Sequence, residues 1–426
     1  MALSRTRRTL GVGMVGYAFM GAAHSQAWRS APRFFDLPAR LRMSVLAGRD
    51  EARLKAAADK YGWESVETDW ARLIDRSDVD IVDICTPGDT HAEIAIAALE
   101  AGKHVLCEKP LANSVEEAEA MAQAARRAAG RGVRAMCGFT YRRVPAARLM
   151  ADLVAEGAIG TLRHIRASYL QDWLADPAAP MSWRLEKDRA GSGALGDIGA
   201  HAIDLAQYVT GDPITGVAAL SSTFVPRRPI PAEGGFLGAD AVADGEYGEV
   251  TVDDATVFLA RTGSGALATF EASRFATGHK NGLRLELNGS DGSIIFDLER
   301  MNELAVYDAR QENPGFRTVL VTEPSHPYIA AWWPPGHTLG YEHAFTHQVR
   351  DFVEAIANGQ DAHPTFDDAL GVQRVLAAAA WLAADKALGR RNRPPGHERA
   401  AQSRDTGDRV AGHVLREVDG VRADVP

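Results

Sequence analysis

A glycine turn near the start of the chain constrains the fold more than any other feature of the sequence. The apolar run Leu10–Val15 leads directly into Gly16-Tyr17-Ala18-Phe19-Met20-Gly21. A strand that ends in a tight glycine turn and continues as a helix is the opening of a dinucleotide-binding βαβ unit, in which the helix N-terminus holds the pyrophosphate. The sequence therefore predicts a nucleotide site at this turn.

Two registers of the glycine pattern compete here. Gly11, Gly13 and Gly16 match GxGxxG literally, but this register leaves only a run of arginines to form the preceding strand. Taking Gly16 as the tight turn and Gly21 as the close contact between helix and sheet leaves alanine at the middle position of the pattern. We expect this second register, and with it five cofactor-binding residues: Gly16, Ala18, Phe19, Met20 and Gly21.

Short apolar strands alternate with helical patterns from residue 9 to about residue 140. This alternation is typical of βαβ units and a parallel sheet. Expected strands are Leu10–Val15, Met43–Ala47, Ile81–Cys85, His104–Cys107 and Val133–Gly138, and expected helices are Glu51–Tyr61, Trp70–Ile74, Thr90–Ala101 and Ser114–Ala129. The three cysteines lie at or near the ends of three of these strands, which predicts buried free thiols rather than a disulfide or a zinc site.

Beyond residue 140 the pattern changes to longer, partly alternating segments separated by glycine-rich turns. Such segments predict an open, mainly antiparallel sheet; they are Leu162–Leu170, Val217–Phe224, Ala255–Arg261, Ala266–Ser273, Leu283–Asn288 and Ser293–Phe296. The stretch Pro226–Thr251, rich in Pro, Gly and Asp, predicts an excursion from the sheet edge that forms part of a site wall or a subunit contact. Helices are expected again at Tyr341–Asn358 and Asp367–Leu388.

The fold class that follows is α/β with two domains. We expect an N-terminal Rossmann domain over residues 9–140 and a C-terminal α/β domain over residues 141–389, built on a large, mainly antiparallel open sheet. Residues 390–426 are charged and poor in large apolar side chains, which predicts a disordered tail.

Composition and charge exclude several functional classes. The chain has 426 residues and a formal net charge of −9 at pH 7, which argues against nucleic-acid binding. No apolar run approaches the ~20 residues that span a bilayer, so no membrane segment is expected. Arginines ahead of the first apolar stretch resemble an export signal, but cleavage there would remove the nucleotide site. We therefore expect a cytoplasmic protein.

The residues after the second expected strand bear on the choice between NAD and NADP. An acidic side chain there accepts hydrogen bonds from the ribose of NAD, whereas an arginine suits the additional phosphate of NADP. The sequence has Gly48-Arg49-Asp50 at this point, so Arg49 is a candidate cofactor ligand and both cofactors stay open, with NAD slightly preferred.

Two further motifs carry ionisable side chains toward the same crevice. Lys109 follows the strand that ends at Cys107, and ligands bind at the carboxyl edge of the sheet in such folds. In Gly196-Asp197-Ile198-Gly199-Ala200-His201, a helix would place Asp197 and His201 one turn apart on one face. Histidine titrates near neutrality and suits proton transfer, so this pair is a candidate catalytic site.

Taken together, these motifs resemble the Gfo/Idh/MocA family of oxidoreductases over about residues 9–390. The resemblance rests on the glycine turn with His24, Asp83-Ile84-Cys85-Thr86-Pro87 with His91, Glu108-Lys109-Pro110, and Gly196–His201. It implies hydride transfer between a sugar carbon and the nicotinamide of NAD or NADP, without a metal ion. Positions that would contact the cofactor, beyond the glycine turn and Arg49, are Thr86, Pro87, His91, Glu108 and Lys109.

The same resemblance implies roles for three catalytic residues. Lys109 would hydrogen-bond the reacting hydroxyl and stabilise the developing alkoxide. His201 would act as the general base in oxidation, and Asp197 would bind a neighbouring hydroxyl and hold the sugar ring.

Within the family, four segments are similar to the levoglucosan-oxidising sugar dehydrogenases: Gly138–Arg143, Tyr169–Trp173, Ser182–Arg184 and Ala190–Asp197. This implies a levoglucosan-like anhydrosugar or a glycoside as substrate, oxidised at C3, and a homodimer or homotetramer that associates through the open sheet face. Aromatic faces cover the C–H surface of a sugar while polar groups meet its hydroxyls. Substrate-binding candidates on this ground, besides Asp197 and His201, are Tyr141, Gln171, Trp173, Trp183 and Tyr341.

Three alternatives stay open at this point. An inositol 2-dehydrogenase would share every catalytic residue named and would oxidise a polyol. A non-catalytic NAD(P)-sensing regulator could use the same fold, although the joint presence of Lys109, Asp197 and His201 argues against it. An exported oxidoreductase would require that the first residues act as a signal.

Overall fold

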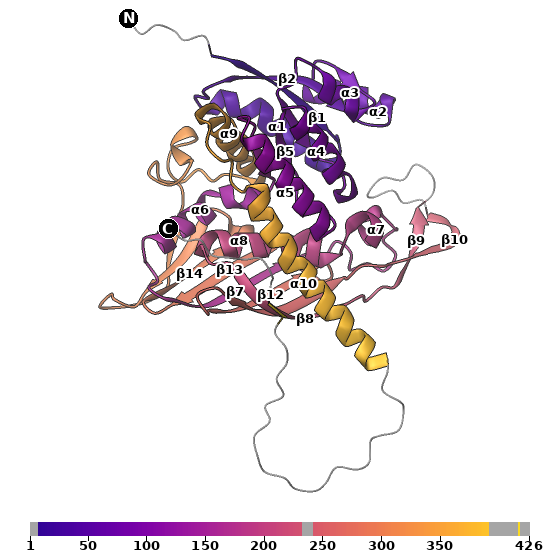
Figure 1. Cartoon of the computed structure of the whole chain (residues 1–426). Helices are drawn as coiled ribbons and strands as arrows, with labels where there is room; N and C mark the ends of the chain where they lie inside the picture. Colours follow the sequence, from indigo (N-terminus) through magenta and orange to yellow (C-terminus); the bar gives the residue numbers. More distant parts are fainter. Residues whose placement is uncertain (1–6, 232–241, 392–415, 418–426) are drawn as a thin grey trace, which may run out of the picture.

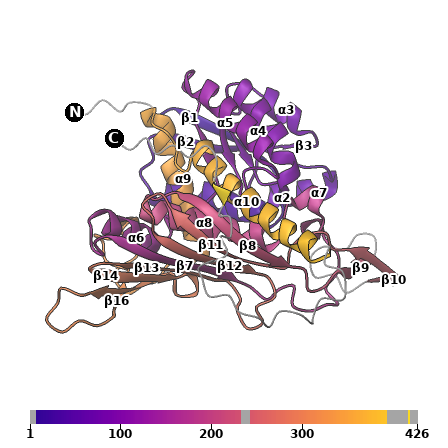
Figure 2. The same ribbon diagram turned by 60° about the horizontal axis from the view of Figure 1, so that its bottom comes forward.

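The computed structural model describes residues 7–231, 242–391 and 416–417 of the chain. Two sheets organise these residues: a parallel sheet flanked by helices, and a larger sheet that carries helices on the side facing the first (Figures 1 and 2). Most of the predicted tail, residues 392–415 and 418–426, lies outside the described residues, as do residues 232–241 of the predicted excursion. The α/β fold class predicted from the sequence is confirmed.

The first sheet has six parallel strands in the order β3-β2-β1-β4-β5-β6. Their bounds are β1 Thr9–Val15, β2 Arg40–Ala47, β3 Val66–Glu67, β4 Ile81–Ile84, β5 His104–Cys107 and β6 Ala135–Cys137. All but the two-residue edge strand β3 were expected. The order reverses between β1 and β4, and the carboxyl ends of these two strands therefore border the crevice in which such sheets bind ligands.

Helices connect these strands as βαβ units require: α1 Phe19–Phe34, α2 Glu51–Tyr61, α3 Trp70–Asp75, η1 Gly88–Thr90 with α4 His91–Glu100, and α5 Val115–Ala129. Their boundaries follow the local sequence. Ser114 and Glu117 form a reciprocal capping box at the start of α5. Asp50 caps α2 through the backbone N–H of Arg53.

The glycine turn adopts the second of the two registers. Gly11 and Gly13 lie inside β1, and Gly16 ends the strand with a φ of 102°, which a residue with a side chain rarely adopts. A Cβ atom on Gly21 would lie 2.3 Å from the carbonyl oxygen of Gly16, so only glycine lets α1 approach the strand this closely.

The second sheet has nine strands in the order β16-β15-β14-β13-β7-β12-β11-β8-β17. Only β7 and β12 pair in parallel, so the sheet is mixed but mainly antiparallel. Its strands are β7 Leu162–Leu170, β8 Ile214–Ser222, β11 Ala255–Thr262, β12 Leu267–Ser273, β13 Gly282–Gly289, β14 Gly292–Asp297, β15 Glu303–Asp308, β16 Arg317–Leu320 and β17 Arg416–Glu417. The predicted excursion forms a separate hairpin of β9 Arg227–Pro231 and β10 Val242–Glu249.

The second half of the chain carries the remaining helices. They are η2 Thr140–Arg143, α6 Pro145–Ala155, η3 Trp183–Leu185, α7 Lys187–Ala190, η4 Leu195–Gly199, α8 Ala200–Thr210, η5 Leu298–Arg300, η6 Ile329–Ala331, α9 Tyr341–Asn358 and α10 Phe366–Arg391. Helix α9 packs on α1, while α10 packs on both α5 and β8 (Figure 1). One buried apolar cluster runs from the parallel sheet through these helices into the second sheet, which fixes the two halves relative to each other.

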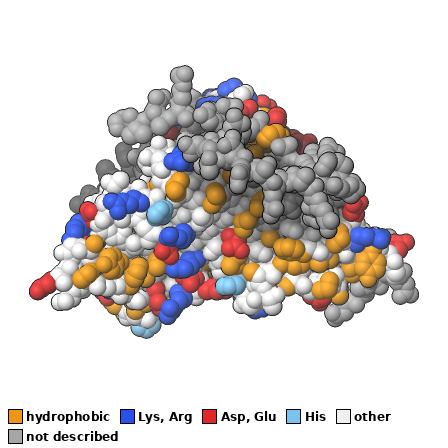
Figure 3. All heavy atoms as spheres, turned by 90° about the horizontal axis from the view of Figure 1, so that it is seen from below, with side chains coloured by type: hydrophobic (Ala, Val, Ile, Leu, Met, Phe, Trp, Pro, Cys, Tyr) orange, Lys and Arg blue, Asp and Glu red, His pale blue; other side chains and the backbone are white. Residues whose placement is uncertain are grey.

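The other face of the large sheet carries no helix among the described residues. Apolar and charged side chains share this face (Figure 3), and its exposed apolar side chains include Leu220, Val257, Leu259 and Leu267. No described helix is long and apolar enough to cross a membrane. The three cysteines are buried and free, as predicted.

Candidate active site

A cavity of about 1360 Å³ is lined by residues that follow β4 and β5 of the parallel sheet and by residues of the second half of the chain. Its lining combines residues from both halves of the chain. Most of the predicted site residues line it: Ala18, Phe19, Met20, Thr86, Pro87, Glu108, Lys109, Tyr141, Gln171, Trp173, Trp183, Asp197, His201 and Tyr341. A second hollow of about 870 Å³, between α6 and α9, contains none of them.

The glycine turn fits the pyrophosphate of a dinucleotide. Helix α1 begins at Phe19 without a side-chain cap and without an acidic residue in its first turn, so its first N–H groups are free for an anion. A Cβ atom on Gly16 would lie 2.8 Å from the carbonyl oxygen of Cys85, so the turn admits no side chain there. Gly16 and Gly21 therefore act through the backbone rather than as lining side chains.

Two predicted cofactor residues do not reach the cavity. Arg49 is exposed after β2, and the neighbouring Asp50 carboxylate is used to cap α2. His91 is buried, with its ring nitrogens 2.9 Å from the carbonyl oxygen of Thr86 and 3.0 Å from that of Pro110. His91 therefore joins the two loops that line the cofactor side, because the first turn of α4 directs its ring between them.

Lys109 connects the two halves of the site. It follows β5, its side chain is 13% exposed, and its Nζ donates to the backbone oxygen of Asp197 at 2.6 Å and to Oδ1 of Asp197 at 3.4 Å. The bond between Lys109 and Pro110 is cis. The ammonium group is thus held at the cavity wall, where it can stabilise negative charge on a substrate oxygen.

The segment carrying Asp197 and His201 differs from the expected α-helix. Leu195–Gly199 forms a π-helical turn, η4, and the α-helix α8 begins only at Ala200. Both side chains still line the cavity. The prediction that they meet at one site holds, whereas the regular one-turn spacing does not.

Asp253 accounts for this irregular turn. Its carboxylate accepts the N–H of Gly193 at 2.7 Å and of Leu195 at 2.8 Å, and its backbone oxygen accepts the N–H of Ala194 at 3.0 Å. A Cβ atom on Gly193 would lie 1.7 Å from that backbone oxygen. Three successive N–H groups are therefore anchored outside the helix, and π-turns of this kind are frequent at functional sites.

Two cations hold Asp197 in its ionised form. Burial alone would raise the pKa of Asp197, but Lys109 and Arg274, with Arg184 behind them, lower it to about 2. Arg274 is fully buried, and its Nη1 lies 3.6 Å from Oδ2 of Asp197. Asp197 is therefore an acceptor at every physiological pH, suited to hold a substrate hydroxyl.

His201 is neutral in this environment. Burial lowers its pKa well below the ordinary value, and the nearby Lys109 ammonium lowers it further. The ring packs 4.5 Å from the Tyr141 ring, and its Nδ1 is buried without a hydrogen-bond partner among the described residues. A neutral imidazole facing a cavity is available to accept a proton.

A chain of hydrogen bonds lines the substrate side. The Tyr141 hydroxyl lies 2.8 Å from that of Tyr169, which donates to Oδ1 of Asn281 at 2.7 Å. Gln171 donates to the same Asn281 oxygen at 2.8 Å, and Trp173 donates to Gln171 at 3.0 Å. Three predicted substrate residues are therefore joined through two that were not predicted, in a row of hydroxyl and amide groups that suits a polyhydroxylated ligand.

The aromatic walls come from several elements. Tyr341, at the start of α9, stacks with Phe19 of the glycine turn at 6.2 Å between ring centroids. The Arg184 guanidinium lies over the Trp183 ring, 4.5 Å from its centroid. Ile230 and Gly248 of the β9–β10 hairpin also line the cavity, so the described part of the excursion contributes to a site wall.

Sequence reasoning missed four residues of the site: Tyr169, Asp253, Arg274 and Asn281. Asp253, Arg274 and Asn281 lie in no motif with a characteristic spacing. Arg274 stands directly after β12 and Asn281 directly before β13, so the pairing of distant strands brings these two to the cavity, while Asp253, before β11, holds the π-turn without lining the cavity. Tyr169, in β7, lies two positions before the predicted Gln171 within the Tyr169–Trp173 motif, and this spacing could have suggested it.

Two family models match the chain in adjacent segments. A model described as an oxidoreductase family with an NAD-binding Rossmann fold matches residues 10–138, and one described as a GFO/IDH/MocA C-terminal domain matches residues 147–295. Among curated proteins, levoglucosan dehydrogenase of Pseudarthrobacter phenanthrenivorans is 43% identical over 366 residues, which cover 85% of this chain and 93% of that protein.

Solved structures agree with these matches. An oxidoreductase domain protein from Kribbella flavida is 63% identical with a TM-score of 0.85, covering 89% of this chain and 98% of its own. Levoglucosan dehydrogenase in complex with NADH and levoglucosan is 42% identical with a TM-score of 0.83, covering 89% of this chain and 98% of its own. The chain thus belongs to the Gfo/Idh/MocA family of NAD-dependent oxidoreductases.

Proposed function

We propose that this protein oxidises a secondary hydroxyl of a small sugar, a levoglucosan-like anhydrosugar or a glycoside, at C3 with NAD⁺. The observation that carries the proposal is the meeting of Lys109, Asp197 and His201 at one cavity that also contains a row of hydroxyl and amide groups. The likeness to levoglucosan dehydrogenase, solved with NADH and levoglucosan, supports the substrate class.

The bound nicotinamide would supply a hydride acceptor at its C4. The fit of the glycine turn to a pyrophosphate, together with the cavity lining at Thr86, Pro87 and Glu108, supports its placement beside Lys109. On this cofactor side the residues act by binding and orientation, and they exchange no proton with the substrate.

Lys109 and His201 divide the work on the reacting hydroxyl. The Lys109 ammonium donates a hydrogen bond to the substrate oxygen and stabilises its negative charge as the proton leaves. Nε2 of His201 accepts this proton, because its Nδ1 is buried and its ring is neutral. Loss of the proton and of the carbon-bound hydride from the same carbinol yields a ketone.

Asp197 and the polar row orient the ring. A carboxylate held ionised accepts a hydrogen bond from a hydroxyl next to the reacting one. Gln171 and Tyr141 face the remaining hydroxyls, while the indoles of Trp173 and Trp183 cover C–H surface. Because these groups are fixed, a bound sugar is held with one carbon aligned with the hydride acceptor.

A panel of substrates tests the proposal. The absorbance of the reduced nicotinamide reports the reduction of NAD⁺ and of NADP⁺ with levoglucosan, methyl glucosides, glucose and inositols as substrates. We expect the highest kcat/KM with levoglucosan or a glycoside and NAD⁺, and NMR of the product shows a ketone at C3. A higher kcat/KM with an inositol supports the polyol alternative, and no turnover with bound cofactor supports a sensing role.

A further inference from the structure

A cluster of three buried ionisable side chains lies on the parallel-sheet side of the cavity, and the mechanism above makes no use of its charge. His24 on α1, Asp83 on β4 and Glu108 after β5 are 1%, 0% and 4% exposed. Nδ1 of His24 lies 2.9 Å from Oδ2 of Asp83, and its Nε2 lies 3.0 Å from Oε1 of Glu108. One imidazole therefore bridges two carboxylates from neighbouring strands.

The contacts of this cluster determine its charge. An ionised carboxylate only accepts hydrogen bonds, so both ring nitrogens of His24 carry protons when both carboxylates are ionised. Burial alone would lower the pKa of His24, but the Asp83 carboxylate raises it well above the ordinary value. Moving the proton from Nε2 of His24 to Glu108 leaves the total charge of the cluster unchanged. The two carboxylates and the imidazolium thus carry one net negative charge in either arrangement.

The surroundings hold this arrangement in place. Trp28 donates to Oδ2 of Asp83 at 2.6 Å, and the Phe345 ring lies 5.4 Å from the His24 ring. Cys85, Asp83 and His24 offer atoms within 4.8 Å of one another. An imidazolium has no lone pair for a metal, however, and both ring nitrogens already face carboxylates.

Only one member of the cluster faces the cavity. Glu108 lies in the lining next to Thr86 and Pro87, whereas His24 and Asp83 lie behind it. Gly138 packs so closely on Glu108 that a Cβ atom there would lie 2.5 Å from Oε1, which leaves the carboxylate little freedom. The charge of the cluster is therefore held rigidly at the cofactor side of the cavity.

The two redox forms of the cofactor differ in charge at the nicotinamide ring, which is positive in NAD⁺ and neutral in NADH. A fixed negative charge in a partly dry site attracts the first form and leaves the second nearly unaffected. Lys109 and Asp197, which also lie near, form an ion pair with each other. Arg274 is a second cation beside Asp197, so these positive charges are paired at Asp197, whereas Glu108 brings the negative charge of the cluster to the lining beside Thr86 and Pro87.

We propose that the His24–Asp83–Glu108 cluster determines specificity for the redox state of the cofactor. Its negative charge lowers the Kd for NAD⁺ relative to the Kd for NADH. The proposal rests on the nicotinamide of the proposed reaction lying against Glu108. Its consequence for turnover is that the oxidised cofactor is retained and the reduced cofactor is released.

Binding measurements without sugar test this proposal independently of the substrate. NADH is titrated by its fluorescence and NAD⁺ by displacement of NADH, for the wild type and Glu108→Gln. The amide keeps the shape and accepts from His24 but removes one negative charge. We expect the ratio of the Kd for NAD⁺ to the Kd for NADH to rise about tenfold, which corresponds to about 1.4 kcal/mol.

Three further variants complete the test. Asp83→Asn removes a charge that lies behind Glu108. It must move the ratio of the two Kd values in the same direction by a smaller factor. This variant keeps the proposal testable if Glu108→Gln fails to fold. Trp28→Phe removes a hydrogen bond from the cluster without changing its charge. Glu64→Gln removes an exposed charge at the opposite edge of the sheet. Both controls should keep the ratio within about twofold of the wild type.

A parallel change of both affinities in folded Glu108→Gln, with the ratio within about twofold of the wild type, would overturn the proposal. Glu108 would then only shape the cofactor site. If Trp28→Phe moves the ratio as far as Glu108→Gln, packing rather than charge sets it, and the proposal also fails. A sugar-inactive protein that shows the expected ratio change would contradict the proposed function alone.

Discussion

Strand β5 has a lysine near each end, and the two lysines have opposite uses. Lys103, before the strand, donates through Nζ to the backbone oxygens of Arg76 at 2.9 Å and Val79 at 2.8 Å. Lys109, after the strand, donates across the cavity to Asp197. The same chemical group therefore closes a loop at the amino edge of the sheet and reaches toward a ligand site at its carboxyl edge.

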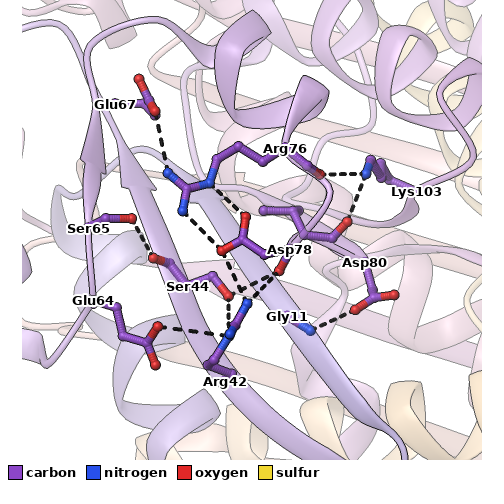
Figure 4. A network of polar contacts seen from close by, with 11 residues as sticks. Gly11, Arg42, Ser44, Glu64, Ser65, Glu67, Arg76, Asp78, Asp80 and Lys103 are labelled. Carbon is purple, nitrogen blue, oxygen red and sulfur yellow. Dashed lines mark hydrogen bonds and ion pairs between the residues drawn. The ribbon is translucent and has the colours of Figure 1, made fainter.

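The amino edge is a self-contained network (Figure 4). Arg76 pairs with Asp78 at 2.9 Å and with Glu67 at 3.4 Å, and Asp80 accepts the N–H of Gly11. Hydrogen bonding to Arg76 lowers the pKa of the Asp78 carboxyl. Every partner comes from the same parallel sheet and its loops.

At the carboxyl edge the partners come from both halves of the chain. Lys109 belongs to the parallel sheet, while Asp197 and Arg274 belong to the second half. His201 keeps a ring nitrogen without a partner among the described residues. The comparison shows that a high density of charges does not by itself identify a site; an ionisable group beside a cavity, with a polar atom left without a partner, is the better indicator.

The largest test of this comparison exchanges the two lysines for alanine in turn. Lys109→Ala should lower kcat by about a thousandfold or more, because the substrate alkoxide loses its stabilising donor, while the variant still binds NAD⁺. Lys103→Ala is the matched control, and steady-state kinetics should show kcat close to the wild type. Loss of cofactor binding in Lys109→Ala, with normal turnover per bound cofactor, would contradict the assigned role.

The next test concerns the π-turn. Asp253→Ala frees the N–H groups of Gly193 and Leu195, so Asp197 and His201 should shift and kcat/KM should fall about a hundredfold. Asp254→Ala is its control, because that carboxylate also accepts two backbone N–H groups, those of Phe224 and Val225, away from the turn.

Both aspartate variants should lose a similar free energy of unfolding, about 1–3 kcal/mol, since each leaves buried donors unpaired. Only Asp253→Ala should lose most of its turnover. Equal losses of kcat/KM in the two variants would mean that general destabilisation, not the position of the turn, governs the rate.

A pH profile gives a smaller effect. If the base had an ordinary histidine pKa of about 6.5, kcat/KM would fall about tenfold from pH 7.5 to pH 5.5. Because the pKa of His201 is lowered, its ring stays unprotonated over this range, and the loss should be less than about twofold. An acid limb centred near pH 6.5 that disappears in His201→Asn would show that the base titrates normally.

The smallest effect is expected at the amino edge itself. Arg76→Ala removes two ion pairs of a side chain that is 27% exposed. Urea unfolding should show a loss of about 1 kcal/mol or less, because partly exposed pairs contribute little. Its kcat and KM should equal those of the wild type, and a clear change in either would break the separation between the two edges.

The sequence was sufficient for the architecture of the parallel sheet because the relevant signals are local. Apolar runs, the glycine turn and the Ser114–Glu117 capping box each act within a few residues, and the structure has all three. The open sheet was also predicted, although its strand order and the parallel pair of β7 and β12 were not. Strand order depends on contacts between distant segments, which periodicity does not encode.

The proposed catalytic residues stand in local motifs that could be read from the sequence, whereas the residues that hold them in place do not. Lys109 follows a strand, and Asp197 and His201 share one short motif. The π-turn that presents them depends on Asp253, sixty positions after Gly193. Arg274 and Asn281 reach the cavity only through the pairing of the second sheet. Arg49 and His91 do not line the cavity, and their contacts with a cofactor stay predictions, because a motif position does not specify where a side chain points.

The bond from Lys109 to the backbone oxygen of Asp197 has a consequence for how such an enzyme can diverge. A carbonyl oxygen is present whichever amino acid occupies the position, so a substitution of Asp197 removes the carboxylate but leaves the shorter of the two contacts, at 2.6 Å. Related enzymes can therefore carry other side chains at position 197, suited to other sugars, while Lys109 keeps its hydrogen bond to the backbone. The acceptor that positions Lys109 therefore belongs to the main chain and does not depend on which side chain stands at position 197.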